Sequence, residues 1–142
     1  MKTYRAIVNG APDGEDGIID LPLGRLDDKR GWWMKVDPRG QKALTLWRVK
    51  GRAEWRGAPI AWLELEPKTG RTHQLRVHCA SQGWPVLGDA IYGARADLPL
   101  QLLARKVVVP FSHSKPPVEA EASAPPHMLE ALKACGFAGD LS

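Results

Sequence analysis

Residues 67–93 read PKTGRTHQLRVHCASQGWPVLGDAIYG and hold an unusual concentration of hydrogen-bond donors. A turn at residues 68–70 leads into a predicted helix over residues 72–82, which a Gly-Trp-Pro sequence ends. Leu75 and Cys79 form the buried stripe of this helix, and a turn bracketed by glycines follows at residues 88–93. The donors gather at the helix start, in Arg71, His73, Gln74 and Arg76. Such a cluster is typical of a site that binds phosphate or an acidic partner.

Alternating segments on both sides of this helix predict strands. The segments at residues 43–50 and 60–66 form a predicted antiparallel hairpin, with a polar connection over residues 51–59. Further strands are predicted at residues 3–9, 33–36, 98–111 and 118–122, and a closing helix at residues 126–135. The predicted fold class is α+β, a mostly antiparallel mixed sheet with flanking helices, in one domain over residues 1–142.

Composition limits the class of protein. The 142 residues are 44% hydrophobic and 25% charged, with a net charge of +4, values that are ordinary for a globular chain and compatible with nucleic acid as a partner. Two cysteines, Cys79 and Cys135, belong to no Cys-x-x-Cys pair, which predicts reduced thiols and a cytoplasmic location. No apolar run approaches the roughly 20 residues of a membrane helix, so no membrane partner is expected.

Several motifs resemble one known family. Residues 69–78, TGRTHQLRVH, followed by Gly-Asp-x-x-Tyr-Gly at residues 88–93, resemble the A-type family of large-subunit ribosomal pseudouridine synthases. Residues 2–10, KTYRAIVNG, resemble the K-x-Y-x-A-hydrophobic-V-x-G strand of that family, and residues 17–23, GIIDLPL, its G-x-I-D-x-P-L turn. Its C-terminal strand and last helix resemble residues 102–110 and 125–128. The resemblance covers nearly the whole chain in order.

The resemblance implies isomerisation of uridine to pseudouridine in a structured RNA, rRNA or tRNA, without a metal or an organic cofactor. This reaction needs a carboxylate, a cation that orients it and an aromatic platform for the flipped base. By resemblance, Tyr4 is the platform and Arg76 is the cation. The resemblance further implies that either Leu102 or Leu103 packs against the base. The remaining donors at the helix start would contact RNA or brace the wall of the site, namely Arg71, Thr72, His73 and Gln74.

One motif of the family does not occur. Its catalytic aspartate lies in H-R-L-D-x-x-T-S-G, upstream of the K-x-Y strand, and no His-Arg-Leu-Asp is present in this sequence. The chain therefore resembles a partial catalytic domain that would be inactive by itself, with a separate N-terminal segment that bears the aspartate as a possible partner. Asp20 and Asp89 lie at predicted turns, where capping of backbone amides is the usual role. The alternative function is a non-catalytic relic of the fold that binds RNA or another protein.

Other interpretations concern single residues. Thr72 fits a helix cap as well as an RNA contact. Trp32 and Trp33 lie beside basic residues and are compatible with base stacking, but we interpret them as the edge of the core. His73 and His78 point about 140° apart around the helix axis, so no metal site is expected there. A partial domain is also predicted to leave an unpaired sheet edge near residues 3–9, which favours self-association.

Overall fold

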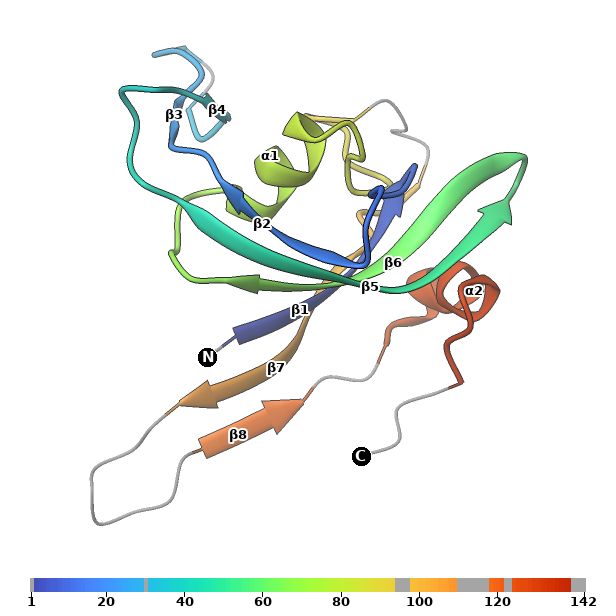
Figure 1. Cartoon of the computed structure of the whole chain (residues 1–142). Coiled ribbons are helices and arrows are strands. Elements are labelled where there is room, and N and C mark those ends of the chain that lie inside the picture. Colours follow the sequence, from blue (N-terminus) through green and yellow to red (C-terminus); the bar gives the residue numbers. More distant parts are fainter. Residues whose placement is uncertain (1, 30, 94–97, 110–117, 122–123, 139–142) are drawn as a thin grey trace.

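The computed structural model describes residues 2–29, 31–93, 98–109, 118–121 and 124–138. One six-stranded antiparallel sheet has the order β2-β5-β6-β1-β7-β8, and a separate hairpin pairs β3 with β4. The strands are β1 (Lys2–Asn9), β2 (Asp16–Asp20), β3 (Leu23–Arg25), β4 (Met34–Val36), β5 (Leu44–Trp55), β6 (Ala58–Pro67), β7 (Leu102–Val109) and β8 (Val118–Glu121), and the helices are α1 (Gln74–Ser81) and α2 (Pro126–Ala134). Figure 1 shows α1 and the β3–β4 hairpin on one side of the sheet and α2 on the other. The predicted α+β class, with a mostly antiparallel sheet and two helices, is confirmed.

Strand β1 lies in the middle of the sheet. Tyr4 pairs with Leu65 of β6 on one side and with Ala104 of β7 on the other. The predicted unpaired edge near residues 3–9 is therefore wrong, because both neighbouring strands come from this chain itself. The outer strands of the described sheet are β2 and β8.

The β5–β6 hairpin is longer than its sequence pattern predicts. Its turn consists of two residues, Arg56 and Gly57, with φ angles of 50° and 79°. Positive φ at both central residues is the geometry of a type I′ turn, which matches the twist of the flanking strands. The predicted polar connection over residues 51–59 is therefore mostly strand. A bulge between Val49 and Gly51 shifts the register within β5.

Each face of the sheet has its own hydrophobic core. On the α1 face, alternate residues of β6 (Ala61, Leu63 and Leu65) pack with Leu75 and Cys79, so the predicted helix stripe is confirmed. On the α2 face, the packing residues include Ile7, Ile60, Met128 and Leu132. The two buried faces explain why the central strands contain so few exposed side chains. Neither helix in the described part of the chain has the length and apolar character needed to span a membrane.

Candidate active site

A cavity of about 620 Å³ opens beside the start of α1, where β1, β6 and β7 also contribute side chains. It is lined by Lys2, Tyr4, Pro67, Lys68, Thr69, Gly70, Arg71, His73, Gln74, Leu75, Arg76 and Leu102. The prediction that Tyr4 and Arg76 face one groove is confirmed, although they are far apart in the sequence. Among the lining residues that the structure describes, four are lysine or arginine and none is Asp or Glu. A cavity of this charge attracts phosphate and other anions.

Gln74 joins the start of α1 to strand β5 and to the preceding turn. Its carbonyl oxygen accepts hydrogen bonds from Thr69 Oγ1 at 2.7 Å and from the Arg71 amide at 3.0 Å. Its amide nitrogen donates to Leu44 O at 2.9 Å and to Thr45 Oγ1 at 3.0 Å. These four bonds use the hydrogen-bonding capacity of the side-chain amide. Gln74 is therefore a brace of the cavity wall, one of the two roles expected for it from the resemblance.

Thr72 does not cap the helix. The helix begins at Gln74, and the N-cap position is held by His73 in the left-handed region, with φ 53° and no capping side chain. Thr72 is exposed and does not line the cavity. The cap interpretation is wrong because the turn before α1 is closed by Gln74 instead, whose side chain accepts from the Arg71 amide.

Arg71 lies at the rim of the cavity with one nitrogen already engaged. Its Nε donates to the carbonyl oxygen of Lys42 at 2.8 Å. In the part of the chain that the structure describes, its two terminal nitrogens make no hydrogen bond. The stem is thus fixed while the charged end stays available to an anion.

Arg76 is paired with Asp89. Its Nε and Nη2 donate to the two carboxylate oxygens at 3.0 and 2.8 Å, the bidentate geometry that arginine forms with carboxylates. The Asp89 side chain is fully buried, and the Arg76 side chain is 18% exposed. Burial by itself raises the pKa of Asp89, but hydrogen bonds from Arg76 and from the amides of Tyr92 and Ile91 lower it overall. The hydrogen bond to Asp89 likewise raises the pKa of Arg76.

Asp89 also closes the turn that follows α1. Its Oδ1 accepts from the backbone amides of Ile91 and Tyr92, both at 3.0 Å, which confirms the predicted capping role. Sequence reasoning missed the ion pair with Arg76. The signal was present in the dense Gly-Asp-x-x-Tyr-Gly pattern, but nothing in a linear sequence states which cation the aspartate meets. With all its bonds made inside the fold, Asp89 is poorly placed to act as a nucleophile.

His73 and Tyr92 form the adjoining part of the wall. His73 Nδ1 lies 2.7 Å from the Tyr92 hydroxyl, and the two rings meet edge to face at 5.5 Å between centroids. Burial lowers the pKa of His73 and the charge of Arg76 lowers it further, while Asp89 opposes both effects. The imidazole is therefore neutral near pH 7.

Of the two leucines considered for base packing, only Leu102 lines the cavity. It packs on the α1 face with Tyr4, whereas Leu103 packs on the α2 face. Neighbouring residues of a strand point to opposite faces of the sheet, so only one of them can reach the site.

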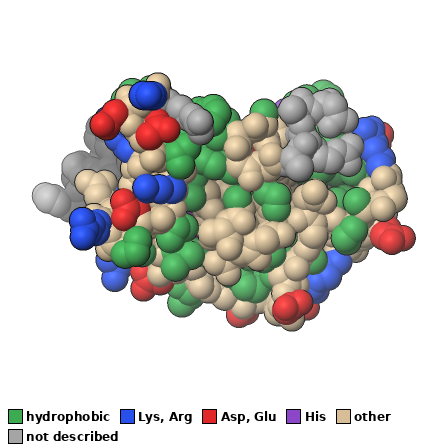
Figure 2. All heavy atoms as spheres, turned by 90° about the horizontal axis from the view of Figure 1, so that it is seen from above, with side chains coloured by type: hydrophobic (Ala, Val, Ile, Leu, Met, Phe, Trp, Pro, Cys, Tyr) green, Lys and Arg blue, Asp and Glu red, His purple; other side chains and the backbone are tan. Residues whose placement is uncertain are grey.

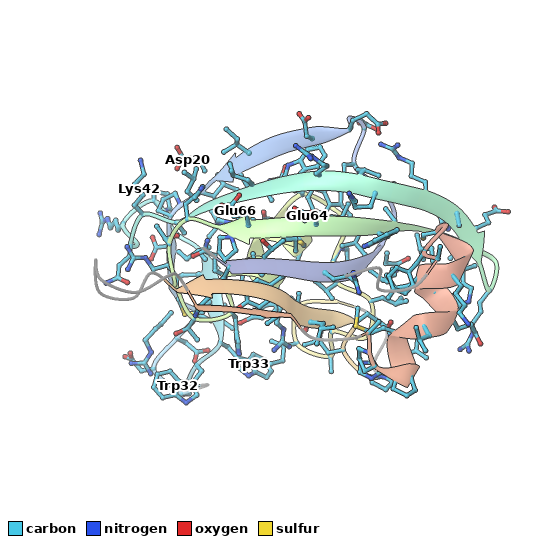
Figure 3. All side chains as sticks on the ribbon, turned by 90° about the horizontal axis from the view of Figure 1, so that it is seen from below. Asp20, Trp32, Trp33, Lys42, Glu64 and Glu66 are labelled. Carbon is cyan, nitrogen blue, oxygen red and sulfur yellow. The ribbon has the colours of Figure 1, made fainter. Side chains whose placement is uncertain are left out.

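The Trp32–Trp33 pair lies at one end of the molecule, apart from Glu64 and Glu66 on the sheet (Figure 3). Trp32 is 75% exposed, so its interpretation as the edge of the core is wrong. Figure 2 looks onto the α1 side, where Lys and Arg side chains gather toward the ends of this face and hydrophobic and other side chains occupy the centre.

Two further aspartates lie away from a position in which they could act as the nucleophile. Asp20 is the exposed last residue of β2 and does not line the cavity. Asp27 completes an Arg-Leu-Asp tripeptide at residues 25–27, but it lies in the β3–β4 hairpin, where it accepts from the Lys29 amide at 3.0 Å. Within the described residues, no three His, Cys, Asp or Glu side chains gather as a metal site would require.

Comparison with known proteins agrees with this geometry. The family model described as RNA pseudouridylate synthase matches residues 1–81. An uncharacterized RNA pseudouridine synthase of Zymomonas mobilis is 38% identical over 133 residues, covering 87% of this chain and 57% of the relative. Ribosomal large subunit pseudouridine synthase D of Vibrio cholerae is 43% identical over 98 residues, covering 69% of this chain and 28% of the relative.

Comparison with solved structures points to the same family. Human RNA Pseudouridylate Synthase Domain Containing 1 superposes with a TM-score of 0.78 at 31% identity, over 94% of this chain and 58% of that one. Human RNA Pseudouridylate Synthase Domain Containing 4 superposes with a TM-score of 0.70 at 25% identity, over 94% and 61% of the two chains. The chain thus spans little more than half the length of several proteins it resembles, and about a third or less of others. Its sequence, its fold and its cavity place it in the RNA pseudouridine synthase family.

Proposed function

We propose that this chain supplies the base-binding and cationic part of a pseudouridine synthase site, and that its substrate is a uridine in structured RNA, rRNA or tRNA, in the cytoplasm. The observation that carries the proposal is that Tyr4, Arg76 and Leu102 line one cavity. In this arrangement Tyr4 is the platform for the flipped base, Leu102 packs against it, and Arg76 orients the reacting carboxylate. The two buried free cysteines, Cys79 and Cys135, are consistent with a reducing compartment.

The cavity supplies cations but no reacting carboxylate. Its described lining residues include no Asp or Glu, and Asp89 is engaged with Arg76 and two backbone amides. In the proposed reaction, the reacting aspartate comes from a separate segment. Arg76 can serve that aspartate while it stays paired with Asp89, because a guanidinium carries five N–H donors and Asp89 accepts from only two of its nitrogens.

The decisive experiment measures pseudouridine formation on uridine-containing RNA, read by mass spectrometry of the nucleosides. The chain is assayed alone and with the separately produced aspartate-bearing half of a full-length relative. We expect no turnover by the chain alone, turnover with the added half, and its loss when Arg76 is changed to Gln. Turnover by the chain alone would contradict the proposed division of the site.

RNA binding is tested separately with a matched pair of charge deletions. Arg71→Ala removes a cation that lines the cavity, and Arg48→Ala removes an exposed cation of β5 that does not line it. We expect Arg71→Ala to weaken binding of single-stranded RNA of any sequence and to reduce the slope of log K against log salt by about 0.7. Arg48→Ala should change neither quantity. Equal effects of both variants would mean that RNA does not bind at the cavity.

The second candidate function is RNA binding without catalysis, by a relic of the same fold. The described lining of the cavity holds cations and no Asp or Glu, which favours this function as directly as it favours a divided enzyme. The two functions differ in the first experiment: a relic binds RNA in the cavity but gives no pseudouridine with any added segment. A protein-interaction relic would bind a partner chain and show no affinity for RNA.

A further inference from the structure

The Tyr92 hydroxyl lies between two groups from distant parts of the chain. The Met34 amide of β4 donates to it at 2.9 Å, and His73 Nδ1 lies 2.7 Å from it on the other side. His73 precedes α1, whereas Tyr92 belongs to the turn that Asp89 closes. One hydroxyl thus ties the β3–β4 hairpin and the glycine-bracketed turn to the wall of the cavity.

The positions of the protons follow from this geometry. The Met34 amide is a donor only, so the Tyr92 oxygen accepts that bond and keeps its own proton to donate. Within the described residues, Nδ1 of His73 is the acceptor that this hydroxyl meets. If every donor at this site is used, the Tyr92 hydroxyl donates its proton to Nδ1 of His73. Nδ1 then carries no proton, and the neutral ring carries its proton on Nε2.

The surroundings favour this neutral tautomer. The charge of Arg76 of α1 acts on His73, Arg71 lines the same cavity, and Asp89 is the nearby carboxylate, already paired with Arg76. None of the described lining residues is Asp or Glu, and the charge of Asp89, which favours an imidazolium, is outweighed by burial and by Arg76. In the described part of the chain Nε2 has no hydrogen-bond partner. His73 lines the cavity, and its ring has one donor without a partner among the described residues.

We infer that Tyr92 is a positioning residue that fixes the tautomer and the direction of His73, and that His73 offers its neutral Nε2–H to an oxygen of the bound uridine nucleotide. This role of His73 rests on the proposed function, whereas the tautomer does not. A neutral donor suits an oxygen acceptor in a cavity that already has several cations, because it adds direction without further charge.

His78, which lies within α1, provides an internal control. Its Nε2 lies 2.9 Å from the carbonyl oxygen of Leu21, and its Nδ1 lies 2.7 Å from Thr45 Oγ1. A carbonyl oxygen only accepts, so His78 has the same tautomer as His73. Both of its nitrogens are engaged and its side chain is fully buried, so it has nothing to offer a ligand. A change in the NMR signal of the His73 ring that leaves the signal of the His78 ring unchanged therefore reports the proposed role.

The first test reads the tautomers by nitrogen-15 NMR of the imidazole rings at pH 8, in the complete chain. We expect the Nε2–H form at both histidines. Tyr92→Phe removes only the hydroxyl, and it should let His73 populate the Nδ1–H form and raise the pKa of His73 toward its ordinary value, with His78 unchanged. Two results would overturn the inference. One is an Nδ1–H tautomer at His73 in the unmodified chain, and the other is a nitrogen-15 signal of His73 that does not change in Tyr92→Phe.

The second test titrates uridine monophosphate and compares two substitutions of similar size. His73→Gln keeps an N–H donor near the position of Nε2, and His73→Leu removes it; neither is β-branched, so both meet a similar cost at the positive φ of residue 73. We expect Gln to retain affinity within about threefold and Leu to lose about tenfold, the worth of one hydrogen bond. Equal affinities of the two variants would overturn the donor role. Failure of the unmodified chain to bind the nucleotide at all would overturn the proposed function, while the tautomer result would still stand.

Discussion

The most consequential single residue is Asp89. It places a fully buried carboxylate against a partly buried guanidinium and also caps the turn at residues 91–92. Removing one partner of such a pair leaves the other charge buried without a partner. This destabilises the fold by more than the intact pair stabilises it. Asp89 therefore links two properties that a sequence pattern treats separately, the shape of a turn and the orientation of Arg76.

We predict that Asp89→Asn destabilises the fold by about 2–4 kcal/mol, because an amide nitrogen then faces the donors of Arg76. Urea unfolding near pH 7 measures this change. The matched control is Glu130→Gln, which breaks the exposed ion pair with Arg56 and should cost less than about 1 kcal/mol. A similar loss of stability in both variants would show that burial of the Arg76–Asp89 pair adds nothing to its effect on stability.

The same substitution has a defined dependence on pH. The pKa of Asp89 is lower in the folded chain than its ordinary value of about 4, so its contribution is complete above that value and is lost as the pH falls through the lowered pKa. The gap in stability between the unmodified chain and Asp89→Asn should thus be constant from pH 5 to 7 and shrink below about pH 4. A gap that instead narrows between pH 5 and 7 would contradict the lowered pKa. Because Asp89 orients Arg76, loss of turnover in this variant would not identify Asp89 as a nucleophile.

Among the elements, α1 depends most on its surroundings. It has eight residues and no capping side chain, and an isolated helix of this length is not stable in water. Gln74 at its first position and His78 one turn later tie it to β5 and to Leu21 through buried hydrogen bonds. The position of the helix, and so of the cavity wall, follows from these tethers more than from helix propensity.

We predict that Gln74→Glu destabilises the chain by about 2–4 kcal/mol although the two side chains have almost the same shape. The new carboxylate would place an acceptor against Leu44 O and bury an unpaired charge at a position that is 4% exposed. Gln82→Glu, at the exposed end of the same helix, is the control and should cost less than about 1 kcal/mol. Thermal unfolding of both variants measures the difference; a mild effect at residue 74 would mean that these bonds do not hold the helix.

At the scale of the whole molecule, the sheet is stabilised by packing on both faces, with α2 closing the second. Strand β5 reaches α2 where Gly51 meets the backbone of Cys135, so closely that a Cβ atom at residue 51 would collide with the Cys135 carbonyl oxygen. The glycine is thus needed for a close approach of two backbones. The bulge beside Gly51 brings that part of β5 into position.

We predict that Gly51→Ala destabilises the molecule by about 2–4 kcal/mol by pushing α2 away from the sheet, within the range for overpacking and strain. Gly70→Ala is the matched control, since an added Cβ there meets no atom within 4 Å. Its effect should stay within about 0.5 kcal/mol. Denaturant unfolding followed by tryptophan fluorescence measures both, because Trp62 lies in the core against α2. If Gly51→Ala were as mild as the control, the contact between β5 and α2 would not limit stability.

Local patterns of the sequence determined most of the strands, the two helices and the family, but not the full length of β5 or the short strand β3. The alternation in residues 60–66 and the Leu75–Cys79 stripe reflect which face of each element is buried. Such a pattern can be predicted from residues that are close together in the sequence. Polar residues with alternative partners were harder to assign. For Gln74 the resemblance left two roles open, an RNA contact and a brace of the wall. Only the structure shows the brace, because the groups that Gln74 bonds in β5 lie about 30 positions away in the sequence.

Only the tertiary structure decided how the distant segments meet. It placed β1 between two strands of its own chain, selected Leu102 over Leu103, and joined Arg76 to Asp89 and His73 to Tyr92. The physical reason is that a residue type and its spacing fix the local backbone and the burial pattern, whereas hydrogen bonds and ion pairs between elements depend on the register and packing of the whole sheet. The sequence by itself thus determined which chemical groups this protein carries, and the fold decided which of them face one another.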